Sequence, residues 1–563
     1  SPEESWEQRT ETTGWATGFS LRRNARSNSI LGRYLIDPFR VKHSYSRGLG
    51  RTWFTRDTTT AASGEVSYNL SLGQMRLLRL PIIEYLRLRP TSVSWTVSRS
   101  NQWETRWDNS GGTPVQTRLS TSRRLFTSGS VGFGFWKGQS TSLGLSVSRD
   151  LLYPWEGDMP FNVGRETSRS QQAGVSQEIN LFDYLKPRLS WDAAYSSSRL
   201  APHTGGNDSL GLHDFSVSTT RKLTLRVGLV HAIRRLARLR DERLDEQAAP
   251  GSPRWLLMKL ERFADRITDP TITISRTQGS DYRDADFLPG YTYRFGLETE
   301  LDELTPYDRT KQDLFQVSTG VRPLSTLSVR GEYSNSVTRH YYSGYWNRQE
   351  STTWPSITVS WSGIERLPPF ESTFRSINLS SGYRVDTSES GRYENEEYVP
   401  TSETRVTKWM PLLSVSATFQ NEVRVSIADN RSVTETLNYT GTSARTRSSS
   451  HGTTLSVEYS FSAPGGIAIP LPLLSKLRVS FQSDLTTSLD ITRSRTVSEV
   501  IGGISGDQVQ SDREEWRIEP AANYDFGSVT AGLTGIYGWK TDRVNSIYNQ
   551  RDVGMNIWIL FNF

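Results

Sequence analysis

The sequence of 563 residues contains no cysteine. This absence excludes a disulfide framework, a thiolate metal site and a cysteine nucleophile. The sequence also lacks any run of about 18 apolar residues, so no stretch of it is predicted to cross a bilayer as a helix. If the chain lies in a membrane, it must do so as a closed β-barrel, the other structure that satisfies every backbone polar group inside lipid.

A strong excess of one charge is missing as well. The chain carries 66 Lys and Arg against 60 Asp and Glu, without a long block of one sign, so no nucleic-acid partner is expected. Its 6 histidines show no metal-ligand spacing. His213 stands beside Asp214, but adjacent residues of a strand point to opposite faces, so the two cannot form a hydrolase dyad. We therefore expect no enzymatic activity, no metal and no organic cofactor.

The clearest feature that is present is the last stretch, 553–563. Every second residue of this stretch, from Val553 to Phe563, is apolar. The residues between them are glycine, asparagine, tryptophan and leucine, so a strand here would be apolar on one face and mixed on the other. An apolar strand that ends on Phe is typical of the insertion signal of outer-membrane β-barrels, and the alternative is the last core strand of a soluble sandwich. The residues predicted to form this barrel insertion signal are Val553, Met555, Ile557, Ile559, Phe561 and Phe563.

Alternating strands recur along the whole chain. In 477–491 apolar residues occupy one parity over a length that exceeds the usual half-buried strand of a soluble protein. Hydrophobic residues make up only 35%, which a barrel tolerates because its lumen is wet, and aromatic residues reach 11%, which suits girdles at the membrane interface. We predict an all-β fold, a transmembrane antiparallel β-barrel of roughly 20–24 strands in the cell outer membrane.

The predicted domain organisation is simple. Residues 1–30 form an N-terminal polar segment with one possible strand near Trp15, and 31–563 form the barrel, with a helical insertion at 231–268. Long polar connections, predicted at 339–353, 385–403, 439–451, 500–513 and 540–552, alternate with short or apolar ones, as in outer-membrane barrels. Apolar connections that contain proline, at 76–89, 180–190, 364–374 and 469–476, are interpreted as a degenerate repeat at one rim of the barrel. The insertion is interpreted as a rim element or as a gate or partner-docking helix. The apolar face predicted for that helix consists of Leu256, Leu260, Phe263 and Ile267.

Five segments, taken in order, carry a resemblance to a known family. They are RLPIIEYLRLRPTSVSW (79–95), INLFDYLKPRLSWDAAY (179–195), NDSLGLHDFSVS (207–218), LPGYTYRFGL (288–297) and the closing stretch from LSKLRVSF to the final Phe. Together they resemble the C-terminal half of the SprA/Sov family, the giant outer-membrane translocon of the type IX secretion system. This chain is far shorter, which leaves open a C-terminal portion, a split translocon and a reduced relative.

The resemblance implies a protein-conducting channel that passes folded proteins through a polar lumen. It also implies partners: outer-membrane lipids, plug or lipoprotein subunits, secreted client proteins and, as an option, a second chain that completes the barrel. Two other functions stay open from the residues alone. The first is a porin-like pore for solutes, and the second is a structural or adhesive surface barrel.

Closure of the barrel is a separate question, because an unpaired strand edge is costly in lipid. Two solutions are open. The last strand pairs with a strand in about the first 50 residues, for example 41–45, or the N-terminal edge pairs with a separate polypeptide. The chain begins at a serine without a signal peptide, so we expect a processed form or the ordered part of something longer.

Overall fold

The computed structural model describes most of the chain and shows a nearly all-β protein. The residues it leaves undescribed are 1–10, 24–26, 30, 53–54, 72–89, 109–113, 154–162, 200–211, 237–252, 303, 343, 395–396, 441–444, 469–477, 504–505, 526–528, 546, 548 and 562–563. The described strands form one sheet of 21 strands, which confirms the predicted all-β barrel fold and its expected strand number.

The strands of the N-terminal half are β1 (Glu11–Arg22), β2 (Phe39–Arg51), β3 (Thr55–Ser71), β4 (Ser92–Asp108), β5 (Val115–Phe133), β6 (Gln139–Asp150), β7 (Arg165–Glu178), β8 (Leu185–Arg199), β9 (His213–Val227) and β10 (Ile267–Ala285). Those of the C-terminal half are β11 (Asp308–Leu324), β12 (Leu327–Tyr342), β13 (Tyr345–Ser362), β14 (Phe374–Glu394), β15 (Glu397–Phe419), β16 (Arg424–Asn438), β17 (Arg445–Ala468), β18 (Arg478–Gly503), β19 (Gly506–Asp525), β20 (Val529–Asp542) and β21 (Gln550–Phe561). The helices are short: η1 (Gly32–Ile36), α1 (Leu229–Leu236), α2 (Pro253–Asp265), α3 (Tyr291–Arg294) and η2 (Ile364–Arg366).

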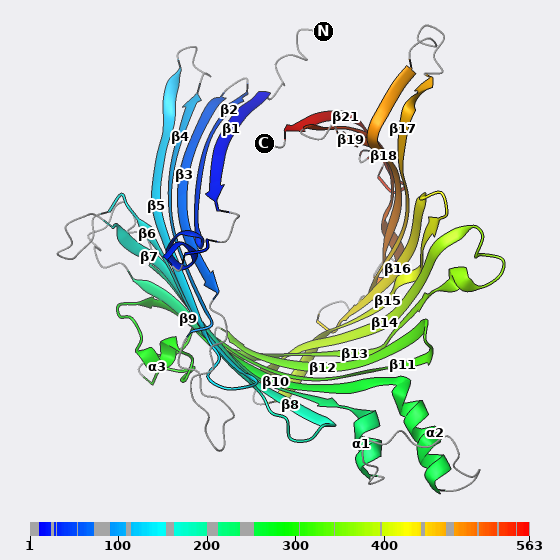
Figure 1. Cartoon of the computed structure of the whole chain (residues 1–563). Coiled ribbons are helices and arrows are strands. Elements are labelled where there is room, and N and C mark those ends of the chain that lie inside the picture. The colour runs from blue at the N-terminus through cyan, green and yellow to red at the C-terminus, as the bar shows by residue number, and fades with distance from the viewer. Residues whose placement is uncertain are drawn as a thin grey trace.

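Each strand pairs antiparallel with the next strand along the chain, from β1–β2 to β20–β21. The sheet curls around a central space, and its first and last strands approach each other across a gap (Figure 1). Because 21 is an odd number, β1 and β21 run in the same direction. No ladder joins these two strands within the described part of the chain.

The alternation of residue types tells the two faces of the sheet apart. α3 lies outside the curl (Figure 1), and its Tyr293 packs against Phe215 of β9 and Tyr282 of β10. These residues therefore point outward. Leu223 of β9 and Ile274 of β10 each lie an even number of residues from Phe215 and Tyr282 and pair with each other, so they also point outward. The apolar parity thus forms the convex face, and the polar parity lines the concave face.

The connections fall on two rims. We call the rim at which β21 ends the C-terminal rim, and the other one the far rim. Strict alternation of strand direction places α1, α2 and the β13–β14 connection on the C-terminal rim, and α3 on the far rim. The predicted Pro-containing connections at 180–190 and 364–374 border this C-terminal rim, although 185–190, with Pro187, already belongs to β8. Those at 76–89 and 469–476 lie outside the described residues.

Several boundaries differ from those expected. The sheet already begins at Glu11, inside the predicted polar segment 1–30, and β1 pairs with β2 along its whole length. The prediction of long polar loops at 339–353, 385–403, 500–513 and 540–552 was wrong, because much of their length continues the ladders of the flanking strands. Cross-strand ion pairs such as that of Arg495 with Asp512, at 2.8 Å, sustain pairing where apolar residues end.

The described helices cover less of the chain than the helical insertion predicted at 231–268. α1 and α2 lie in or next to 231–268, and the rest of the predicted charged helix, 237–247, lies outside the described residues. The assignment of Ile267 to the helical face was wrong. α2 ends at Asp265, and Ile267 opens β10, where it pairs with Val321 of β11. The described helices include none with the length and hydropathy required to cross a bilayer.

Candidate channel wall and its edges

The convex face carries a continuous apolar band. On β19 its residues run from Tyr524 near the C-terminal rim to Trp516, with Ile518 between them. Eight residues along a strand tilted by about 45° rise about 19 Å, to which the rings at both ends add, close to the band of about 25 Å in outer-membrane barrels. Large apolar side chains stay exposed in this band, including Ile274 at 47% and Phe315 at 42%. An exposed apolar surface marks a contact with lipid or with another protein, and a band on the outer face of a barrel indicates lipid.

Aromatic side chains border the band on both sides. Near the C-terminal rim, Phe374 and Phe419 pack with ring centroids 4.6 Å apart. Toward the far rim, Tyr383 of β14 lies 5.4 Å from Trp409 of β15. Aromatic girdles of this kind mark the two interfaces of a bilayer. The fold, the band and the girdles make this protein an integral outer-membrane β-barrel protein, as the sequence predicted.

The concave face is lined by hydroxyl groups. Pairs of Ser and Thr side chains from neighbouring strands bond to each other at 2.6–3.3 Å all around this face, which therefore presents a neutral and hydrated surface. These pairs are Ser44–Ser63, Ser94–Ser130, Ser140–Ser176, Ser196–Ser216, Thr220–Thr277, Ser328–Ser360, Ser351–Ser388, Thr404–Thr436 and Ser460–Thr486.

Many charges on the concave face are neutralised by a neighbour. Arg106 of β4 donates two hydrogen bonds to Asp57 of β3, at 2.7 and 2.9 Å. The carboxylate of Asp386 accepts hydrogen bonds from Thr353, at 2.7 Å, and from Lys408, at 3.2 Å. Paired charges hold ligands and passing chains weakly, because their hydrogen-bonding groups are already engaged. The lining is thus polar, and part of its charge is neutralised by neighbouring side chains.

The predicted insertion signal lies on an edge of the sheet. Val553, Met555, Ile557 and Ile559 share one parity of β21, with exposed fractions of 78, 73, 66 and 59%. Phe561 ends β21 opposite Val529, and Phe563 lies outside the described residues. The register places this apolar parity on the convex face, in the row of Leu533 of β20. The apolar side chains therefore face lipid, while the backbone edge of β21 faces the gap.

The N-terminal edge of the sheet is β1. Its outward residues Trp15, Phe19 and Leu21 are exposed to 55, 54 and 63%. The segment 41–45, considered above as a partner for the last strand, lies inside β2, which is paired on both sides. That choice was wrong, because β1 occupies the edge that 41–45 was expected to offer.

The residues of the predicted docking helix are only partly brought together. Leu260 and Phe263 lie on α2 with exposed fractions of 44 and 59%, whereas Ala264 of the same helix is buried. Leu256 lies on α2 in a part whose side chains are outside the described set, and Ile267 is on β10. The apolar face of α2 thus stays open to its surroundings at the C-terminal rim.

One packed connection on the far rim, which we call the latch, was not predicted from the sequence. We use this term for the connection 286–307 with α3, which folds back on the outer face of β8, β9 and β10. Tyr293 is fully buried there, its hydroxyl group lies 2.9 Å from that of Ser280, and burial raises its pKa. The amide of Leu301 donates to the Tyr282 hydroxyl at 2.9 Å. The segment LPGYTYRFGL was the available signal, since its closely spaced aromatic residues suit a packed connection.

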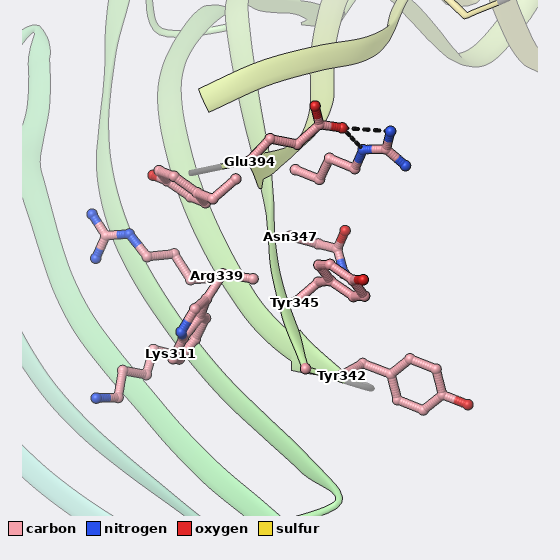
Figure 2. Close-up of a pocket in the computed structure, with 10 residues that line it drawn as sticks. Lys311, Arg339, Tyr342, Tyr345, Asn347 and Glu394 are labelled. Carbon is pink, nitrogen blue, oxygen red and sulfur yellow. Dashed lines mark hydrogen bonds and ion pairs between the residues drawn. The ribbon is translucent and has the colours of Figure 1, made fainter. Parts of the chain in front are cut away.

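The chemistry excluded from the sequence finds no new support in the structure. Asp214 accepts a hydrogen bond from the backbone amide of Asp284 at 3.0 Å, so its carboxylate is occupied away from an imidazole. No group of three or more metal-ligating side chains occurs among the described residues. A hollow of about 1080 Å³ lies at the far rim between the β12–β13 hairpin and the end of β14, as Figure 2 shows.

Comparisons with known proteins assign no family to the chain. It matches no protein-family model and no curated protein sequence. Among solved structures it is similar to the ferric preacinetobactin receptor BauA of Acinetobacter baumannii, with a TM-score of 0.40 and 9% identity, over 98% of this chain and 78% of that one. The outer membrane transporter YddB of Escherichia coli gives a TM-score of 0.29 and 8% identity, over 89% and 75%. Similarities at this level assign neither a ligand nor an activity.

Proposed function

We propose that this chain forms most of the wall of an outer-membrane protein-conducting channel, related to the SprA/Sov translocon of the type IX secretion system. In this proposal, strands of a polypeptide segment outside these 563 residues complete the wall, and folded client proteins pass through its polar lumen. The proposal rests on the two edges of the sheet, on the width of the channel and on its lining.

The parallel direction of β1 and β21 is the observation that carries the proposal. Bacterial barrels made of one chain have an even number of strands, so that every pair, including the closing one, is antiparallel. With 21 strands in the described part of the chain, a closing pair formed by β1 and β21 would be parallel. An odd number of added strands restores antiparallel pairing at both edges.

A second copy of the same chain does not solve this problem. Both copies would have the same orientation in the membrane, so all their edge strands would run toward the C-terminal rim. Every contact between two copies would again be parallel. The completing segment therefore differs from this chain, and the strands it sets beside β1 and β21 run toward the far rim.

The width of such a channel suits folded cargo. If 21 strands about 4.8 Å apart and tilted by about 40° closed into a ring, its backbone diameter would be about 42 Å. A lining of side chains about 5 Å deep on each side reduces the inner diameter of the channel to about 32 Å. A compact domain of about 100 residues is about 33 Å across. The added strands widen the ring, so a folded domain fits.

The lining supports the same function. Cross-strand hydroxyl pairs such as Ser196–Ser216 and paired charges such as Arg106–Asp57 cover the concave face. A neutral, hydrated wall gives a passing protein few attachment points, whereas a receptor for one ligand needs a converging set of free groups. No described helix or strand crosses the enclosed space (Figure 1). The ordered resemblance of the five segments adds to this argument.

Native purification with mass spectrometry of the bound proteins tests the proposal. A translocon should bring down the completing polypeptide segment, a plug or lipoprotein subunit and a secreted client. A porin-like pore should appear instead as a homo-oligomer with steady ion conductance and no client. Purification of this chain alone, closed and conducting, would contradict the proposal.

A further inference from the structure

Outward-facing cations lie directly opposite each other on neighbouring strands near the far rim. Arg221 of β9 pairs in register with Arg276 of β10. One row further from the C-terminal rim, Lys311 of β11 pairs with Arg339 of β12, and Arg339 pairs with Arg348 of β13. Like charges directly opposite each other destabilise a sheet. Two such rows on adjacent strands therefore need an anion between them.

The protein supplies only part of this countercharge. Arg276 binds Asp313 at 2.6 Å, and Arg348 binds Glu350 at 2.5 Å. Lys311 is 3.9 Å from Glu300, a carboxylate that also contacts Arg309. Among the described residues, Arg221 and Arg339 make no ion pair, and both side chains are exposed. The patch, defined as Arg221, Arg276, Lys311, Arg339 and Arg348, thus has an excess of positive charge.

On β18 and β19, the cations of the same outer face are paired with carboxylates. Arg493 binds Glu514 at 2.9 Å, and Arg495 binds Asp512 at 2.8 Å. Arg543 then contacts both carboxylates, at 3.0 and 3.7 Å. Carboxylate side chains thus neutralise the arginines in this part of the outer face. The excess charge on β9–β13 is a local feature rather than a property of the whole far rim.

The patch lies where the apolar band ends. The row next to Arg221 and Arg276, toward the C-terminal rim, is Leu223–Ile274, followed by Phe315 of β11. Arg221 also pairs with Trp191 of β8 on its other side, and Trp favours the interface. In a membrane, the cations of the patch are thus at the depth of the lipid head groups, directly above the acyl chains.

The patch borders the large hollow at the far rim. Lys311 and Arg339 line it together with Trp346, and in Figure 2 both long side chains extend to the same side, away from Tyr342. A group with several oxygens can accept hydrogen bonds from both cations at once. An acyl chain attached to that group would lie on the apolar band.

We propose that this patch binds the phosphate group of a phosphorylated lipid of the outer leaflet. The phosphate lies between Lys311 and Arg339, with Arg348 in the same row and Arg221 in the neighbouring row, and the acyl chains cover Phe315 and Ile274. The proposal rests on the membrane position of the band and not on protein transport. It assigns the lipid a place on the wall, beside the latch of 286–307.

Native mass spectrometry in detergent with added bis-phosphorylated lipid A tests this site. The wild-type protein should retain the lipid, and the double variant Lys311→Gln with Arg339→Gln should bind it at least about tenfold more weakly, because two charge-assisted hydrogen bonds are lost. Arg221→Gln, which breaks no described contact, should weaken binding to a smaller extent. Arg330→Gln is the matched control, since Arg330 is on β12 but on the concave face, and it should bind like the wild type.

Three results would overturn the proposal. The first is equal retention of lipid A by the double variant, shown to be folded by its heat-modifiable migration. The second is an equal loss in Arg330→Gln, which would indicate a general charge effect. The third is full competition by inorganic phosphate at equal concentration, which would assign the site to free phosphate. Copurification of a client or a completing segment is independent of all three results.

Discussion

Trp516 and Trp539 stack on the outer face of the sheet, with ring centroids 5.6 Å apart and 11° between their planes. They are cross-strand partners on β19 and β20, at the far end of the apolar band. Beyond them the outer face carries ion pairs, such as Arg493 with Glu514, in place of apolar residues. This pair therefore marks the boundary at which the lipid-facing wall gives way to the part of the barrel in water.

The first prediction concerns the two faces of β20. Because the protein has no native cysteine, a spin label can be attached to a single new one. A label at Leu533→Cys, on the apolar parity, should be accessible to oxygen dissolved in lipid. A label at the adjacent Thr534→Cys should be accessible to a water-soluble nickel reagent, because adjacent side chains point to opposite faces. Equal accessibility of the two labels would contradict the assignment of lipid and lumen faces.

The second prediction concerns the end of the chain. Replacing Phe561 and Phe563 by Ser removes the last two apolar residues of the predicted insertion signal, so assembly into the membrane should fail while the protein still reaches the periplasm. Loss of the heat-modifiable band in outer-membrane fractions is the measurement. Asn556→Ser, on the other parity of β21, is the control and should assemble normally. Normal membrane levels of the double variant would show that these residues are no insertion signal.

The third prediction concerns the latch. Burial raises the pKa of Tyr293, so the folded protein resists ionisation of this hydroxyl group. Its contribution to stability is complete below the ordinary tyrosine pKa of about 10 and is lost as the pH rises through the higher folded value. An absorbance titration of Tyr293→Phe should show one fewer late-ionising tyrosine than that of the wild type. A titration unchanged by this variant would contradict the packing of the latch.

The stability of the latch follows from the same contacts. Tyr293→Phe loses the hydrogen bond with Ser280 and should cost about 1 kcal/mol, whereas Tyr293→Ala also empties a buried site and should cost about 3–5 kcal/mol. Limited proteolysis within 286–307 at neutral pH measures the difference. Cleavage should increase strongly in the Ala variant and slightly in the Phe variant.

Sequence patterns predicted the wall well, because the chemistry of each face repeats every second residue. Met555, Ile557 and Ile559 identify the last strand without any knowledge of its neighbours. The ends of the strands were harder to predict. Asp512 reads as part of a polar connection until it is known to pair with Val497 and to bind Arg495 on the neighbouring strand. Pairing between distant residues, which a single strand does not reveal, decides where a ladder stops.

The two edges and the basic patch depend on register in the same way. β1 and β21 run in the same direction because the number of described strands is odd. A predicted number of roughly 20–24 strands does not say whether the number is odd or even. Lys311 and Arg339 are 28 positions apart and become neighbours only through the pairing of β11 with β12. Ile267 shows the opposite error, since a helical period fitted it although the chain had already entered β10.

The central claim is that strands from outside these 563 residues complete the wall, and a photo-crosslinker placed at Ile557 in native membranes tests it most directly. This residue lies on the edge strand β21, which pairs with β20 only on one side. We predict that the crosslinked peptide, identified by mass spectrometry, has a sequence that does not occur in this chain. A peptide from β1, within one molecule or in a second copy, would contradict the account.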